Sequence, residues 1–224
     1  MRLAVPLAVA AALAPVAAHA QQEDVQQWTL LATQGKVSDK VVVYAEIQPR
    51  LTDDVGRLGQ LLIRPAVGYE FSRNFTALLG YAYVRTEPLN GRATDEHRIF
   101  QQVNSVLYRG PNGFVLSGRT RFEQRTVVGR DDTGLRLRHW FRGQGPIRPG
   151  GKLQAIAWVE PFYNLNSTEW GQRQGFDQVR SFIGLGVPIT KGLTAEPGYL
   201  NQTVFRRGED RVNHVASLTL FYRF

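Results

Sequence analysis

A row of alternating charges runs through residues 117–125 and is the most informative stretch of the sequence. Every second side chain there is polar or charged, and most of the residues between them are apolar or small. Guanidinium and carboxylate groups in such a row can pair with one another, or they can hold an anion where arginine is in excess. This face is therefore the first candidate functional surface. Its members are Ser117, Arg119, Arg121, Glu123 and Arg125.

The three histidines beyond residue 20 decide whether acid–base catalysis has a candidate. Hydrolytic sites commonly pair a His with Ser, Asp or Asn. His214 has polar neighbours, but alternation along a strand places it on the face opposite to theirs. His139 shares a face with apolar residues. His97, adjacent to Asp95 and Glu96, is the remaining candidate for a loop-borne acid–base site, and an ordinary solvated loop is the alternative.

The sequence predicts neither a metal site nor a cofactor. No two histidines have the spacing of metal ligands, and Asp131-Asp132 is too small a cluster for a calcium site. Gly184-Leu185-Gly186 lacks the third glycine and the following helix of a nucleotide-binding loop. There is no cysteine, so disulfides and thiol chemistry are excluded.

The same period of two predicts the elements that position these charges. Segments of about ten to fourteen residues, rich in Val, Leu, Tyr and Phe, alternate with clusters of Gly, Asn, Asp and Pro. No helical periodicity competes with this pattern over a useful length. We predict strands at 41–50, 58–70, 75–87, 96–108, 114–127, 134–142, 153–164, 177–187, 193–205 and 212–224.

The last predicted strand ends on the terminal aromatic residue of the chain. One of its faces is apolar and the other carries Asn, Ser, Thr and Arg. A strand that stops at an aromatic carboxyl terminus looks like the closing strand that Gram-negative outer-membrane barrels present to their assembly machinery. The residues of this C-terminal assembly signal are Leu218, Leu220, Tyr222 and Phe224.

One further strand-like segment, residues 25–35, complicates the strand count. It would make eleven strands, whereas single-chain bacterial barrels have an even number and both termini should face the periplasm. Either the segment lies inside or beneath a ten-stranded barrel, or a twelfth strand is present. We favour ten strands.

Membrane energetics assign the charged faces to the lumen, because an Arg that faces lipid at mid-membrane costs about 2–4 kcal/mol. The resulting interior is a ladder of Arg and Glu with Arg in excess. A packed, salt-bridged interior is the first interpretation, and a narrow pore or pocket for an anion is the second. The predicted lumen residues are Glu46, Arg64, Glu70, Arg98, Arg119, Arg121, Glu123, Arg125, Arg136, Arg138, Glu160, Arg180 and Glu196.

The first twenty residues are expected to be removed. Arg2 gives a minimal basic head, residues 3–16 are almost wholly apolar, and Ala18-His19-Ala20 matches a signal-peptidase site. Residues 21–224 then form a single domain. They contain no apolar run of about 20 residues, which excludes a helical membrane protein. The formal net charge of the whole chain is +8, which suits lipopolysaccharide phosphates or small anions, and no nucleic-acid motif is present.

Several blocks occur in an order that identifies a family. They are Trp28, Tyr44–Arg50, Glu96–Gln102, Arg119–Arg125 and Gly198–Gln202, and together they span most of residues 21–224. In these blocks the sequence resembles domain-of-unknown-function family 2490, a family of outer-membrane barrels. The resemblance implies a small barrel in the outer membrane. It implies no activity and carries over no catalytic residue.

We expect an all-β chain that forms a transmembrane, antiparallel, up-and-down β-barrel of about ten strands, with twelve as the alternative. The expected function is that of a non-enzymatic protein of the cell outer membrane with a charged lumen. A narrow anion-preferring channel and a lipid-modifying enzyme are the two alternatives. A soluble barrel of lipocalin type, with its apolar face inside, is the rival fold. Expected partners are outer-membrane lipids, lipopolysaccharide and the barrel-assembly machinery, with small anions as a further candidate; nucleic acid is excluded.

Overall fold

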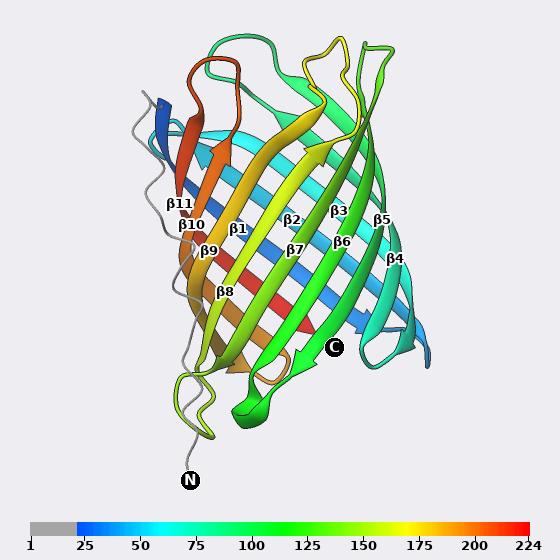
Figure 1. Cartoon of the computed structure of the whole chain (residues 1–224), viewed down its shortest axis with the longest axis vertical. Helices are drawn as coiled ribbons and strands as arrows, with labels where there is room; N and C mark the ends of the chain where they lie inside the picture. Colours follow the sequence, from blue (N-terminus) through cyan, green and yellow to red (C-terminus); the bar gives the residue numbers. More distant parts are fainter. Residues whose placement is uncertain (1–21) are drawn as a thin grey trace.

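The computed structural model describes residues 22–224, which form a closed barrel of eleven strands (Figure 1). The all-β prediction is confirmed. The signal peptide predicted for residues 1–20 lies outside the described residues. The strands are β1 (Gln22–Lys36), β2 (Val41–Thr52), β3 (Arg57–Ser72), β4 (Phe75–Thr86), β5 (Thr94–Arg109), β6 (Val115–Val127), β7 (Thr133–Pro146), β8 (Gln154–Asn164), β9 (Gly175–Thr190), β10 (Leu193–Val204) and β11 (Arg211–Arg223), and a 3₁₀ turn, η2 (Pro111–Gly113), precedes β6.

The barrel closes between its first and last strands, and this is the one parallel pair. The register runs from Gln22 opposite Arg211 to Gln34 opposite Arg223. All other neighbouring strands are consecutive in the chain and antiparallel. An odd number of strands can therefore close, because the parallel pair removes the need for an even count.

This closure corrects two expectations. The segment 25–35 lies neither inside nor beneath the barrel, because it is part of β1 and pairs with both β2 and β11. The two described termini do not share one side: Gln22 lies at one end of the barrel and Phe224 at the other (Figure 1). The even-number rule failed because it assumes that every pair is antiparallel.

The ten strands predicted from alternation correspond one to one to β2–β11, with ends that differ by a few residues. Because neighbours alternate in direction, the connections fall at two ends. The Gln22 end holds the connections 53–56, 87–93, 128–132, 165–174 and 205–210, and the Phe224 end holds 37–40, 73–74, 110–114, 147–153 and 191–192. Among residues 22–224, no helix has the length and apolar character needed to cross a membrane.

One of the two connections that are only two residues long needs a glycine. Strands β9 and β10 are joined by Lys191 and Gly192 alone, and Gly192 has a φ of +86°. A Cβ atom at this position would lie 2.4 Å from the carbonyl oxygen of Arg223. The turn therefore depends on a residue that tolerates both the left-handed backbone and the close approach of β11.

Apolar packing fills one side of the lumen. Phe182 stacks on Trp158 with 5.3 Å between the ring centroids. Its ring occupies the space left by Gly184 and Gly198, where a Cβ would approach it to 2.4 Å. Most of the buried Arg and Glu side chains come from β2–β7, where Leu62, Val84 and Phe100 are also buried. The apolar cluster consists of Trp28, Ile156, Phe182, Leu200 and Val215, with Trp158 packed against it.

The parallel closure predicts a specific cross-link. Thr29 and Leu218 are partners in the β1–β11 register and point away from the lumen. Cysteines at both positions should form a disulfide on mild oxidation, because paired strands bring Cα atoms within bonding range. The natural chain contributes no competing thiol. Cross-linked peptides identified by mass spectrometry provide the readout.

The control pairs Thr29 with Leu220, two residues further along β11. This displacement of about 7 Å along the strand puts the second pair out of range. The eleven-stranded closure would be contradicted if the control pair cross-linked faster than the Thr29–Leu218 pair, or if neither pair cross-linked.

Candidate functional site: the arginine-rich lumen

The register of β6 and β7 brings the predicted charges into one space. Glu123 lies opposite Arg136, and Arg121 lies opposite Arg138. Two arginines directly opposite each other on a sheet are destabilising by themselves. The arrangement therefore depends on carboxylates placed between them.

Glu123 is the first of these carboxylates, and only 1% of its side chain is exposed. Its Oε2 accepts hydrogen bonds from Nε and Nη2 of Arg136 at 2.9 and 2.6 Å. Its Oε1 accepts one from Nη1 of Arg138 at 3.0 Å, and a nitrogen of Arg121 lies 3.8 Å away. A single buried carboxylate thus compensates three guanidinium groups.

Glu160 on β8 extends this network to a third strand. Nη2 of Arg138 donates to both of its carboxylate oxygens, at 2.8 and 2.9 Å, and Arg119 donates to Oε1 at 2.8 Å. Arg138 therefore bridges Glu123 and Glu160. Charge-assisted bonds of this kind are stronger than neutral ones, and here they connect three adjacent strands.

A second cluster lies nearer the Gln22 end. Both oxygens of Glu96 accept bonds from Arg98 at 2.8 Å, and Arg125 donates to the same carboxylate at 2.5 and 3.3 Å. Asp177 on β9 lies 3.3 Å from Nη1 of Arg136, whose other nitrogens donate to Glu123. The carboxylates of both clusters are saturated by arginine.

Three further pairs lie toward the Phe224 end. Glu46 forms an ion pair with Arg64 and accepts a hydrogen bond from the hydroxyl of Tyr44. Arg142 donates to both oxygens of Glu196, at 2.9 and 2.7 Å. At the rim, Glu70 pairs with Lys36 at 2.6 Å, and this pair is the most exposed of the three.

Two buried arginines have no carboxylate partner among residues 22–224: Arg50 on β2 and Arg180 on β9. Arg50 donates to the amide oxygens of Gln60 and Gln48, each at 2.7 Å, and its Nε has no partner. Arg180 donates from Nε to Gln178 at 3.3 Å. Both guanidinium groups lie over the ring of Trp28, at 3.7 and 5.0 Å from its centroid.

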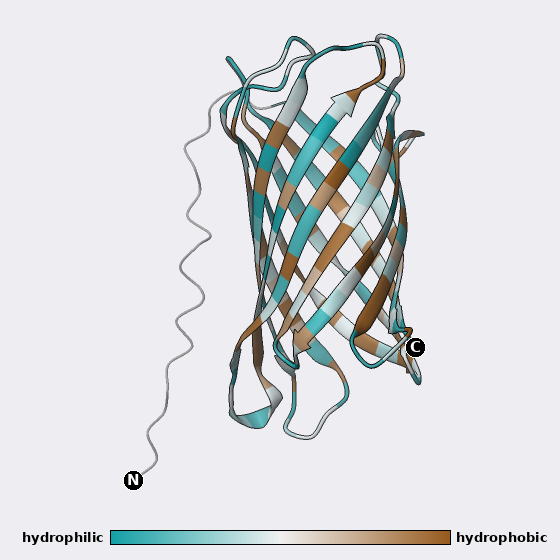
Figure 2. Cartoon of the chain, turned by 90° about the vertical axis from the view of Figure 1, so that its right-hand side faces the viewer, coloured by the Kyte–Doolittle hydropathy of each residue, from teal (hydrophilic) through white to brown (hydrophobic). Residues whose placement is uncertain are grey.

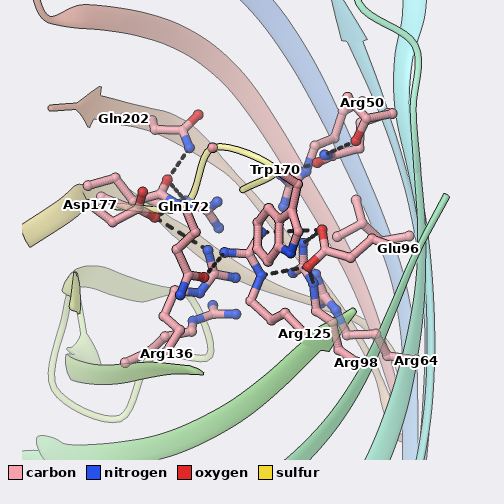
Figure 3. A pocket seen from close by; sticks show the side chains of 17 residues that line it. Arg50, Arg64, Glu96, Arg98, Arg125, Arg136, Trp170, Gln172, Asp177 and Gln202 are labelled. Carbon is pink, nitrogen blue, oxygen red and sulfur yellow. Dashed lines mark hydrogen bonds and ion pairs between the residues drawn. The ribbon is translucent and has the colours of Figure 1, made fainter. Parts of the chain in front are cut away.

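Two cavities in the lumen are lined by these arginines. One of about 340 Å³ lies at the Gln22 end, and one of about 690 Å³ opens toward the Phe224 end. Figure 3 shows the smaller cavity, with arginines from several strands pointing into it. The walls of the two cavities share four arginines, which form the boundary between them. These are Arg50, Arg64, Arg138 and Arg180.

The connection between β8 and β9 covers the smaller cavity (Figure 3). Gln172 accepts a hydrogen bond from Arg125 at 3.0 Å and donates to the carbonyl of Leu135 at 3.3 Å. The indole nitrogen of Trp170 donates to the carbonyl of Asp132 at 2.9 Å, and the ring stacks near Arg125. We call Trp170-Gly171-Gln172 the cap.

A carboxylate contact outside the barrel holds the cap connection in place. The side chain of Glu169 accepts hydrogen bonds from the backbone N–H groups of Asp131 and Asp132, at 2.9 and 3.1 Å. The carboxylate of Asp132 in turn accepts one from the backbone of Glu169 at 2.8 Å. The interaction with Asp132 lowers the pKa of Glu169 to about 2, whereas the same contact raises the pKa of Asp132.

The histidines lie on the outer wall. His97 bonds to the hydroxyl of Tyr81, His139 to that of Thr120 and His214 to that of Tyr199. The proposed neighbours of His97 separate, because Glu96 points into the lumen and Asp95 bonds to Tyr83 and Arg85 instead. Within residues 22–224, no three His, Cys, Asp or Glu side chains are grouped as a metal site would require.

The structure places the predicted charged ladder inside the barrel, with Glu70 at the rim. Sequence reasoning missed Arg50, although it shares the strand and parity of Glu46. It also missed Asp177, which faces the cavity beside Gln178 where the β8–β9 register shifts. Nothing periodic in the sequence marks the cap.

Three comparisons place the chain among known proteins. The profile of a family described as "Protein of unknown function (DUF2490)" matches residues 25–213. An uncharacterized protein of Methylorubrum extorquens is 40% identical over 204 residues, which covers 90% of this chain and 89% of that protein. No solved structure matches.

Removal of the central carboxylate should destabilise the barrel far more than removal of one at the rim. Glu123→Gln leaves three buried guanidinium groups without their shared counter-charge, and we expect a loss of about 3–5 kcal/mol in the free energy of unfolding. Glu70→Gln breaks a partly exposed pair and should cost less than about 1 kcal/mol. Urea unfolding of the refolded variants in detergent measures both, and equal losses would refute the central role of Glu123.

Proposed function

The chain belongs to the DUF2490 family of proteins of unknown function, and we propose that it is an integral outer-membrane β-barrel with a non-enzymatic role in the cell envelope. The observation that carries the proposal is the inverted distribution of side chains: the charges are buried inside the barrel and the large apolar side chains are exposed outside. A soluble barrel distributes its side chains in the opposite sense.

The composition of the outer wall supports the proposed location in a lipid bilayer. Large apolar side chains are exposed on every strand except β6, and those at mid-strand include Ile47, Leu79 and Ile183. Figure 2 shows the alternation of hydrophobic and hydrophilic positions along the strands that produces this wall. Soluble monomers rarely expose contiguous apolar surface beyond a few hundred Å². A wall of this kind is suited to the acyl chains of a bilayer.

Aromatic residues at the strand ends support the same location. Tyr69, Phe71 and Phe75 pack edge to face at the Phe224 end. Tyr163 and Phe176 form a similar contact at the Gln22 end, with 5.3 Å between centroids. Such clusters at both ends are typical of the interfacial girdles of membrane barrels.

Lipopolysaccharide is the proposed partner at the Gln22 end. The connections there carry exposed arginines, which suit phosphate groups. These exposed arginines are Arg92, Arg130, Arg173, Arg206 and Arg207.

The barrel-assembly machinery is the proposed partner at the other end, where it would contact the outward face of β11.

The ion pairs support a lumen that is closed to free flow. The bridge from Glu123 through Arg138 to Glu160 fixes buried side chains on the inner face of three adjacent strands, and side chains can nearly fill barrels of this size. Breaking it would require separating buried charges, which is costly. The network therefore fits a structural role.

The two alternatives have unequal support. An anion-preferring channel is favoured by Arg50 and Arg180, because their charges have no carboxylate partner in the described part of the chain. A lipid-modifying enzyme that uses His97 has less support, because the neighbouring Glu96 faces the other side of the wall.

Substitution of one outward residue separates a membrane barrel from a soluble one. Ile183 lies at the centre of β9 and is 65% exposed. In lipid vesicles, Ile183→Arg should lower the free energy of unfolding by about 2–4 kcal/mol, because the charge would face acyl chains. Val128→Arg, in a connection at the Gln22 end, is the control and should change it by less than about 0.5 kcal/mol. A negligible effect of Ile183→Arg would rule out the membrane location.

Planar-bilayer recording tests the closed lumen. The refolded protein, residues 21–224, should show no steady current in a salt gradient, because the arginine side chains between the two cavities obstruct the lumen. A heat-modifiable gel shift confirms that the sample is folded. Steady anion-selective steps would instead establish the channel, and the selectivity should then fall when Arg119, Arg121 and Arg125 are replaced by Gln.

A further inference from the structure

We infer that the cavity at the Gln22 end is a binding site for a small phosphate-type oxyanion. The inference goes beyond the proposed function, because it requires the folded barrel but neither a membrane location nor a conducting lumen. It is carried by the charge of the cavity wall, by the two arginines that lack carboxylates and by the cap.

The wall of this cavity has a large excess of positive charge. Seven arginines line it, against two carboxylates. Both carboxylates are already engaged, Glu96 by Arg98 and Arg125 and Asp177 by Arg136. Glu46, Glu123 and Glu160, which lie outside this wall, compensate Arg64, Arg136 and Arg138. The charge that stays uncompensated is therefore that of Arg50 and Arg180, and a bound anion would supply the counter-charge.

Arg50 and Arg180 are where that charge is missing. Their hydrogen-bond partners in the described part of the chain are neutral amides, and stacking over Trp28 compensates a buried cation only in part. The two terminal nitrogens of Arg180 donate to no other residue between 22 and 224 and belong to a side chain that lines the cavity. They are available to a ligand.

The arrangement of the arginines selects the class of anion. The four that form the boundary between the cavities come from β2, β3, β7 and β9, so guanidinium groups line this part of the cavity from several sides of the barrel. A planar carboxylate presents two oxygens, whereas a tetrahedral phosphate presents three or four and can engage several guanidinium forks at once. A volume of about 340 Å³ restricts the ligand to a free phosphate, a small phosphomonoester or a single lipid headgroup.

The cap would keep such a ligand away from bulk water. Trp170 and Gln172 lie over the cavity beside Arg125 and Arg136 (Figure 3). Excluding water strengthens the attraction between arginine and anion, because the local dielectric constant falls. The hydrogen bond that Gln172 accepts from Arg125 and the one that it donates to the carbonyl of Leu135 hold the cap in this position.

Titration calorimetry of the folded protein in zwitterionic detergent tests the inference. Sodium phosphate is added at an ionic strength kept constant with sodium chloride, and saturable binding is expected. Arg50→Gln and Arg180→Gln should each weaken it at least about ten-fold, because each removes a charged donor. Arg142→Gln, which changes an arginine of the other cavity paired with Glu196, should leave the affinity unchanged.

A second titrant, dihexanoyl phosphatidic acid, identifies the source of the phosphate group. Binding of this lipid alone that is lost in Arg180→Gln would assign the site to a headgroup, and binding of inorganic phosphate would assign it to a solute. Arg180→Lys keeps the charge if the Gln variant does not fold, and the loss of the planar fork should still weaken binding several-fold. No binding of either titrant, or equal affinity in wild type and the Arg180 variants, would overturn the inference.

Discussion

Every charge that a closed barrel turns inward must find a counter-charge or water, and this requirement governs the interior of the protein. Alternation leaves the charged residues of β6 and β7 no other direction, because their remaining face forms the outer wall. Two buried carboxylates each pair with more than one arginine: Glu123 contacts three and Glu160 contacts two. Sharing in this way leaves an arginine excess that is confined to a few positions instead of being spread along the lumen.

The sequence predicted those parts of the fold that depend on local periodicity. Each of β2–β11 could be located because its own residues show a two-residue period and are bounded by turn residues. The same period assigns Arg119 and Arg136 to the lumen side of the wall. The role of β1 could not be inferred in this way. Its partner β11 is almost the whole chain away, and strand alternation says nothing about whether two distant strands run parallel. The cap could not be inferred from the sequence either. Its position depends on hydrogen bonds from Trp170 and Gln172 to β7 and to the connection before β7, and a local sequence period does not predict such contacts.

The parallel closure has consequences for the candidate site. Because β1 is a strand of the barrel wall, Trp28 lies in the apolar cluster of the lumen and under the guanidinium groups of Arg50 and Arg180. Its aromatic face partly replaces the carboxylate that these two arginines lack. A strand that lay beneath the barrel would not provide this contact. The position of β1 in the barrel wall, which the even-number rule made hard to predict, thus helps to stabilise the two arginines that have no carboxylate partner.

Binding and transport place opposite demands on the arginines between the two cavities. Arg50, Arg64, Arg138 and Arg180 belong to both walls, so an anion that moved from one cavity to the other would have to pass among them. Arg138 is held from both sides by Glu123 and Glu160, and moving it would break two buried ion pairs. Arg180 is held by a single bond to a neutral amide and could reorient at much lower cost. The boundary is therefore rigid on the β7 side and adaptable on the β9 side, a combination that suits capture of an anion at the boundary better than its passage through it.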